Sequence, residues 1–261
     1  MFSPASRYGI TGATLALWAL TACGSSSDGG GDGPTTVPAT TQTAAKDRGP
    51  QCVGESPAGG VHVLRGGGFR LPGGGGVQYA AASADGTSRT ATLRDGAAYG
   101  SGQRQWTVKP GSRVTVSGHA YTVRQVCSYR VVLEPKDAKA KAALAAAPES
   151  MEFAGGAADD TLCFTTNRAV LAATAKSFPA KGQTLSLLAN GGAKQLPTGP
   201  SLTVSYIDTT AGTAGLGANC AGVPVAIYKD VSVGDTVEFS GVLFKVSGLT
   251  EQGVRLTRTS E

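Results

Sequence analysis

The chain is predicted to be all-β, with two tandem small antiparallel β-sandwich or barrel-like domains that follow a disordered tether and are joined by a short helix. Three observations predict this class. Apolar and polar residues alternate over short segments, turn residues separate those segments, and one stretch of the pattern recurs 123 positions later. Alternation with a period of two is typical of half-buried antiparallel strands.

The alternation is clearest in the segment that follows Gly111. Val114, Val116, Tyr121 and Val123 occupy every second position of two short runs, with polar residues between them. The dipeptide at 117–118, Ser-Gly, separates the two runs and favours a tight turn, so a hairpin is predicted here. Further strands are predicted at 77–83, 89–94, 105–108, 202–207 and 223–228.

An internal repeat organises the rest of the chain. Residues 108–133 align without a gap on residues 231–256, and eight of the 26 positions are identical. The identical pairs include the Ser-Gly turn, which recurs at 240–241. Two copies indicate tandem related domains rather than a long solenoid. The predicted boundaries are a first β domain at 51–138, a helical connector at 139–148 and a second β domain at 149–261.

Helix signals are few. The Ala-rich segment 137–147 lies between Pro135 and Pro148, which favour a short helix between them. Residues 167–175 are compatible with a helix or with a strand.

The N-terminal 22 residues are predicted to be an export signal. Their apolar stretch, 8–19, has 12 residues and is too short to span a bilayer as a helix. It ends in Leu20-Thr21-Ala22-Cys23, which resembles the lipobox of bacterial lipoproteins. The resemblance implies that Cys23 is lipidated after cleavage of 1–22, and that the protein is anchored at the outer face of the cytoplasmic membrane. Residues 23–50 then comprise the lipidated cysteine and a flexible linker.

The repeated segment has a second, weaker resemblance. Its turn, its alternating valines and its Gly followed by an aromatic residue look like small uncharacterised bacterial β proteins. That resemblance covers about 26 residues of each copy and implies no activity.

The cysteine count agrees with an oxidising compartment. Setting Cys23 aside leaves an even number, Cys52, Cys127, Cys163 and Cys220. Four cysteines allow three pairings. Cys52 with Cys127 and Cys163 with Cys220 are preferred, because each pair then lies within one predicted domain.

Positive charge is concentrated in the first predicted domain. Residues 51–138 carry ten Lys or Arg against five Asp or Glu, whereas residues 139–261 carry ten of each. Alternation places Arg113, Arg124 and Arg130 on the faces opposite the valines, so they are expected to project into solvent together. An anionic lipid or a cell-wall polymer is the expected partner, and nucleic acid is not. Trp106 is interpreted as a core residue, with an exposed recognition role as the alternative.

Known catalytic patterns have little support. The only histidines, His62 and His119, lie in or beside predicted strands, and no Gly-x-Ser-x-Gly elbow occurs. The carboxylate pairs 159–160 and 149/152 are interpreted as turn or surface residues. The glycine runs 66–68 and 73–76 are interpreted as flexible loops, because neither has the P-loop pattern. No metal or cofactor is expected.

These observations favour a membrane-anchored binding or scaffold module rather than an enzyme, with a cell-envelope hydrolase as the alternative. The sequence does not identify a ligand or a protein partner.

Overall fold

Antiparallel β-strands make up most of the residues that the structure describes, in agreement with the predicted all-β class. A computed structural model describes residues 49–71, 75–145, 163–196, 200–220 and 223–261. The predicted export signal, most of the linker and the carboxylate pairs at 149/152 and 159–160 lie outside these residues.

The first copy of the repeat lies in two sheets. One has the order β1-β8-β9-β2, with β7 also paired to β8, and the other has the order β3-β4-β5-β6. Its strands are β1 (Cys52–Gly54), β2 (Val61–Leu64), β3 (Gly68–Arg70), β4 (Gly76–Ala84), β5 (Arg89–Asp95), β6 (Gln105–Val108), β7 (Arg113–Val116), β8 (His119–Cys127) and β9 (Arg130–Pro135).

The second copy repeats this topology. Its sheets have the orders β10-β17-β16-β15 and β11-β12-β13-β14, which match those of the first copy apart from β1. Its strands are β10 (Thr184–Leu188), β11 (Lys194–Gln195), β12 (Pro200–Asp208), β13 (Thr213–Cys220), β14 (Val223–Val231), β15 (Thr236–Phe239), β16 (Val242–Thr250) and β17 (Gly253–Arg258). The internal repeat therefore extends well beyond the 26 residues in which sequence identity is visible.

The predicted repeat is confirmed strand by strand. β7, β8 and β9 become β15, β16 and β17 when 123 is added to each of their bounds. The register shift in β8 between Val123 and Gln125 recurs in β16 between Val246 and Gly248. Both Ser-Gly turns have two positive φ angles, 51° and 81° in the first copy and 49° and 78° in the second. Two successive positive φ angles are what a tight two-residue hairpin requires.

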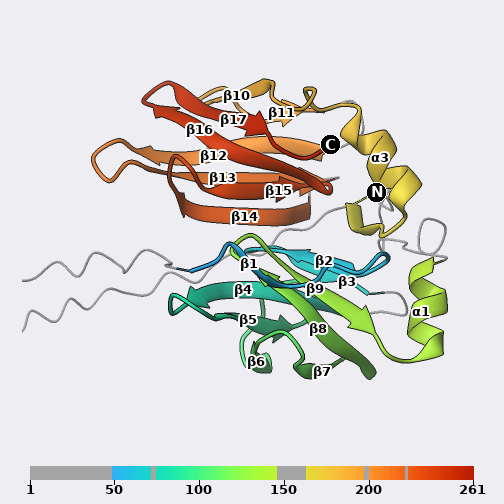
Figure 1. Cartoon of the computed structure of the whole chain (residues 1–261). Coiled ribbons are helices and arrows are strands. Elements are labelled where there is room, and N and C mark those ends of the chain that lie inside the picture. Colours follow the sequence, from blue (N-terminus) through green and yellow to red (C-terminus); the bar gives the residue numbers. More distant parts are fainter. Residues whose placement is uncertain (1–48, 72–74, 146–162, 197–199, 221–222) are drawn as a thin grey trace, which may run out of the picture. The chain divides into compact units, whose positions relative to one another are not determined.

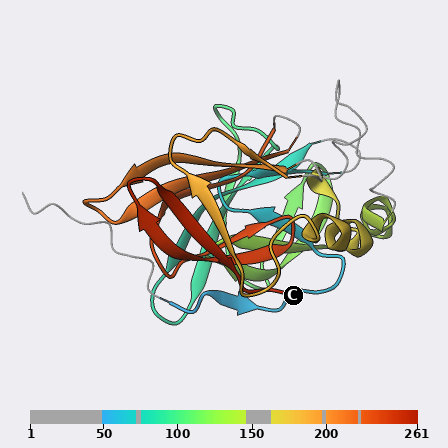
Figure 2. The same ribbon diagram turned by 90° about the horizontal axis from the view of Figure 1, so that it is seen from above.

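Two helices occur among the described residues, and both views of the ribbon place them at the same end of the sheets (Figures 1 and 2). α1 (Ala138–Ala145) falls within the predicted helical segment, and the Asp137 carboxylate accepts the Ala140 N–H at its start. α3 (Arg168–Ala175) settles the ambiguous segment as a helix. The Asn167 side chain caps it by accepting the N–H groups of Ala169 and Val170.

Both preferred disulfides are present. Cys52 of β1 and Cys127 of β8 face each other in the strand register, with their Cα atoms 4.0 Å apart. Cys163 and Cys220 are joined with a Cα separation of 5.6 Å. The first bridge therefore fastens the N-terminal strand to its sheet, and the second fastens the segment before α3 to β13.

The two copies are in direct contact. The described residues form one compact unit, and β14 lies against β2 and β3 (Figure 1). The Ile227 N–H donates to the Arg65 carbonyl at 2.9 Å. The boundaries 51–138 and 149–261 stay a prediction about which segments fold independently.

The glycine run 66–68 makes this contact possible: Gly66 lies in a turn, Gly67 links the turn to β3, and Gly68 begins β3. A Cβ atom on Gly66 would lie 2.1 Å from the Ile227 carbonyl oxygen, and one on Gly67 would lie 1.9 Å from that of Val225. Such distances exclude any side chain. The run therefore provides close backbone approach between the copies.

Candidate functional site

A pocket of about 180 Å³ opens between the two copies. Its apolar wall includes Phe69 from the first copy, Val225 and Phe239 from the second, Phe164 just before α3 and Leu171 within α3. Its polar lining residues come from both copies and include Ser56, His62, Thr166, Arg168, Glu238 and Ser240. A concave apolar site with a few convergent polar groups is the usual form of a small-molecule site.

A glycine-containing turn positions the first part of the lining. In residues 57–60 the Gly60 N–H donates to the Pro57 carbonyl at 3.2 Å, and Gly59 has φ +76°. A Cβ atom on Gly60 would lie 2.6 Å from Cγ1 of Val132, so the turn packs directly on β9. Ser56 precedes this turn and His62 follows it on β2.

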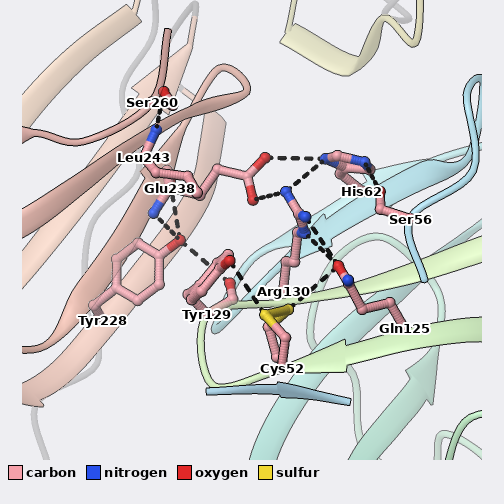
Figure 3. A network of polar contacts seen from close by, with 11 residues as sticks. Cys52, Ser56, His62, Gln125, Tyr129, Arg130, Tyr228, Glu238, Leu243 and Ser260 are labelled. Atoms are coloured by element: carbon pink, nitrogen blue, oxygen red, sulfur yellow. Dashed lines mark hydrogen bonds and ion pairs between the residues drawn. A yellow bond between two sulfur atoms is a disulfide. The ribbon is translucent and has the colours of Figure 1, made fainter. Parts of the chain in front are cut away.

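Glu238 is the only buried acidic residue in the part of the chain that the structure describes, and its side chain is 1% exposed. Its Oε1 lies 3.0 Å from Nδ1 of His62, and its Oε2 accepts from Nη1 of Arg130 at 2.9 Å. Figure 3 shows Glu238 of the second copy reaching between these two residues of the first. The two copies therefore share one charged network.

Both faces of β15 are buried, which explains how a glutamate in an alternating strand is enclosed. Val237 and Phe239 pack in the core of the second copy. Glu238 points the other way, where the first copy covers it. The same holds in β9, where Val131, Val132 and Leu133 are all 0% exposed.

The imidazole of His62 connects the buried carboxylate to a hydroxyl group. Its Nε2 lies 3.3 Å from Oγ of Ser56, while Nδ1 faces Glu238 (Figure 3). An ionised carboxylate can only accept hydrogen bonds, so Nδ1 carries the proton and donates it to Glu238. Nε2 then has a free lone pair that accepts the Ser56 hydroxyl.

A second layer of contacts holds this network in place. Nε and Nη2 of Arg130 donate to Oε1 of Gln125 at 3.2 and 2.9 Å. The Tyr228 hydroxyl accepts the Glu238 N–H at 3.1 Å and lies 2.9 Å from the Glu238 carbonyl. Burial raises the pKa of Tyr228 well above its usual range, which keeps this hydroxyl neutral.

The pKa of Glu238 results from opposing effects. Burial raises it, but the hydrogen bond and charge of His62 and the charge of Arg130 outweigh burial and hold the pKa below its usual value. Glu238 is therefore ionised at neutral pH inside the protein. His62 and Arg130 together make this buried carboxylate compatible with folding.

One cation at the pocket has no ion-pair partner among the described residues. Arg168, the first residue of α3, is exposed and lines the pocket. Its guanidinium is therefore available to an anionic group of a ligand.

The predicted cluster of solvent-facing arginines is only partly formed. Arg113 is exposed, and the Arg124 side chain is 40% exposed with Glu134 at 3.9 Å. Arg130 is a correction, because its side chain is 12% exposed and pairs with Glu238. Alternation put it on the face opposite the valines, and that face of β9 is covered by the second copy.

The other predicted residues lie away from the pocket or outside the described chain. Trp106 is half-buried against the core of the first copy, with the Arg104 guanidinium 5.2 Å from its ring centroid. His119 Nδ1 lies 3.2 Å from Asp137 at the start of α1. Cys23 lies outside the described residues.

Sequence reasoning missed the group Ser56, His62 and Glu238. Glu238 is 176 positions from His62, and no local motif marks either residue. The aligned repeat contains no signal for it, because Thr115 occupies the position of Glu238 in the first copy.

No family model, curated protein or solved structure matches the chain. The described residues contain no cluster of three metal-ligating side chains, and none of their helices is long and apolar enough to cross a membrane.

Proposed function

We propose that the protein is a membrane-anchored extracytoplasmic lipoprotein that binds a small ligand in the pocket between its two β copies. The pocket is the observation that supports binding, because it combines an apolar wall with few polar groups. The lipobox-like segment at Cys23 supports the anchor at the outer face of the cytoplasmic membrane. The two disulfides agree with an oxidising compartment.

The lining favours a small amphipathic anion as the ligand. The Glu238 charge is compensated by Arg130, so Arg168 is the available charge at the pocket. Phe69, Phe164 and Leu171 offer apolar surface for a short hydrocarbon part. A volume of about 180 Å³ is similar to that of a cavity of about 150 Å³ that binds benzene, which limits the enclosed part of the ligand to fragment size.

Calorimetry with the full chain in non-ionic detergent tests this function. We expect hexanoate to bind and hexanol to bind more weakly, because only the carboxylate can pair with Arg168. The variant Arg168→Gln should weaken hexanoate binding by about tenfold, whereas Arg113→Gln, which changes an exposed arginine outside the pocket, should leave it unchanged. Equal binding of hexanoate by all three proteins would contradict the assignment.

We also propose that the first copy contacts an anionic lipid or a cell-wall polymer, with Arg113 and Arg124 as the contributing residues. The exposure of these two side chains supports this contact. Arg130 is not included, because its side chain is 12% exposed and pairs with Glu238. Exposed charges are screened over about 8 Å at physiological ionic strength. The amount of protein that sediments with anionic vesicles should therefore fall as the salt concentration increases, and Arg113→Gln should lower this amount. Sedimentation that is independent of salt would contradict this contact.

A further inference from the structure

We propose that Ser56, His62 and Glu238 form a nucleophilic relay that hydrolyses small carboxylic esters in the pocket. The inference rests on the proposed binding function only in that the same pocket holds the ester. It goes beyond that function because it assigns an acyl-transfer reaction to residues that otherwise would only line the pocket.

The three side chains have the connectivity that such a relay requires. Oγ of Ser56 lies 3.3 Å from Nε2 of His62, and Nδ1 of the same ring lies 3.0 Å from Oε1 of Glu238. In nucleophilic catalysis a hydroxyl faces a base, and a third group orients that base. All three residues line one pocket, and Ser56 and His62 are both open to solvent while Glu238 is not.

Arg130 fixes the protonation pattern that the relay needs. It pairs with Oε2 of Glu238 and leaves Oε1 for His62. Because the carboxylate only accepts hydrogen bonds, in the neutral imidazole Nδ1 carries the proton that faces Glu238, and Nε2 is the acceptor that faces Ser56. Nη1 of Arg130 is 3.5 Å from Nδ1, farther than Oε1 of Glu238, so the carboxylate contact determines the tautomer.

The reaction balances with water as the only co-reactant. Oγ of Ser56 bonds to the ester carbonyl carbon while its proton moves to Nε2 of His62. The carbon–oxygen bond to the alcohol then breaks, and the same proton passes to the departing alkoxide. Water next attacks the acyl-serine ester, gives a proton to Nε2, and releases a carboxylic acid as the proton returns to Ser56.

Backbone donors for the developing oxyanion are available in the turn beside Ser56. The N–H groups of Ala58 and Gly59 donate to no atom of the described residues, and both residues line the pocket. Two free backbone N–H groups next to a nucleophile are the usual composition of an oxyanion site. The apolar wall of Phe69 and Phe164 suits a short acyl chain.

The same geometry predicts a slow enzyme. The Arg130 guanidinium lies beside the imidazole and opposes the positive charge that His62 gains during attack. We therefore expect turnover of activated aryl esters of short carboxylic acids, such as 4-nitrophenyl butyrate, rather than of amides.

The competing explanation is purely structural. On this explanation, His62 and Glu238 hold the two copies together, and Ser56 is an exposed residue with no role in catalysis. The two explanations differ at Ser56, because its hydroxyl makes only the hydrogen bond to His62 among the described residues. Removing that hydroxyl abolishes catalysis in one case and changes nothing in the other.

The experiment uses the full chain in non-ionic detergent and a fluorophosphonate probe, followed by peptide mass mapping and by assay with 4-nitrophenyl butyrate. We expect covalent labelling of Ser56, and we expect Ser56→Ala to lose the label and to lower kcat/KM at least 100-fold. Ser101→Ala, which removes an exposed serine outside the pocket, should behave as the unmodified protein. His62→Gln should lose the label while circular dichroism shows a folded chain.

Two results would overturn the relay: an absence of label on Ser56 at saturating probe, or ester hydrolysis that is equal in the Ser56→Ala variant and the unmodified protein. Hexanoate binding separates this failure from failure of the proposed function. If hexanoate binds both proteins but Ser56 is unreactive, the pocket is a binding site and the relay is wrong. If hexanoate does not bind and Ser56 is unreactive, both proposals are wrong.

Discussion

Replacing Arg130 by methionine would test the charged contact between the copies. The substitution keeps an unbranched side chain of similar length but removes the partner of Oε2 of Glu238. It leaves a carboxylate that is 1% exposed with only the imidazole of His62 beside it. The variant therefore buries an uncompensated charge, which is among the most destabilising changes available in a folded protein.

The contacts of Arg130 set the size of the effect. Arg130 donates one charge-assisted hydrogen bond to Glu238, and two further N–H groups of Arg130 donate to the side-chain oxygen of Gln125. Removing one partner of a buried ion pair costs about 3–5 kcal/mol in free energy of unfolding. For a chain of this size that corresponds to a fall in Tm of roughly 6–20 °C.

The free energy of unfolding that Arg130→Met loses must depend on pH. In the unmodified protein the pKa of Glu238 is below its usual value, so its contribution to stability is present above the unfolded pKa of about 4.3 and is lost as pH falls through the folded value. In Arg130→Met the charge and hydrogen bond of Arg130 no longer lower the pKa of Glu238, so this pKa rises relative to the unmodified protein, and the carboxylate is neutralised at a higher pH as pH falls. The stability difference between the two proteins should therefore shrink from pH 7 to pH 4.

Urea unfolding followed by circular dichroism at pH 7 and pH 4 measures both effects. The double variant Arg130→Met/Glu238→Leu is the control, because it removes both charges together and should recover much of the lost stability. The reasoning is refuted if Arg130→Met lies within about 1 kcal/mol of the unmodified protein at pH 7, or if its cost is the same at both pH values.

Three further predictions concern the anchor, the contact between copies and the second disulfide. Cys23→Ala should release the protein into the medium or leave an uncleaved precursor, and membrane fractionation would contradict the anchor if the variant stayed bound and normally processed. Gly67→Ala should lower the free energy of unfolding by about 1–3 kcal/mol through overlap with β14, whereas Gly100→Ala, with only ordinary contacts, should cost little. Replacing Cys163 and Cys220 by serine should cost about 4 kcal/mol, from a sequence separation of 57; a midpoint of urea unfolding equal to that of the disulfide-bonded protein would exclude this contribution.

The elements that local patterns specify were predictable. Alternation and the Ser-Gly dipeptides identified the hairpins of both copies because a strand face and a two-residue turn are properties of neighbouring residues. The helix at α3 was not decided, since its apolar run is short. The Asn167 cap, which favours the helix, becomes clear only when its side chain is seen accepting two N–H groups.

The pocket could not be predicted, because alternation distinguishes two strand faces without saying what covers the second one. Arg130 and Val132 share the face of β9 that alternation assigns to solvent, but Glu238 of the second copy pairs with Arg130, and the turn at 57–60 packs on Val132. Val132 was the one available hint that this face of β9 is not exposed to water. Glu238 gave no such hint, since a glutamate between two apolar strand residues usually points into solvent.

The hydrogen bond from the Ile227 N–H to the Arg65 carbonyl affects how readily the edge of β14 can pair with another molecule. β14 is the last strand of its sheet, and an unprotected last strand invites pairing with another molecule. The backbone of the first copy partly covers this edge, so one copy shields the other from intermolecular sheet growth. The equivalent edge in the first copy is β6, which is only four residues long and has the Arg104 side chain over Trp106. Equivalent edges of the duplicated fold thus differ: a backbone hydrogen bond from the other copy partly covers β14, whereas β6 is short and has an arginine beside it.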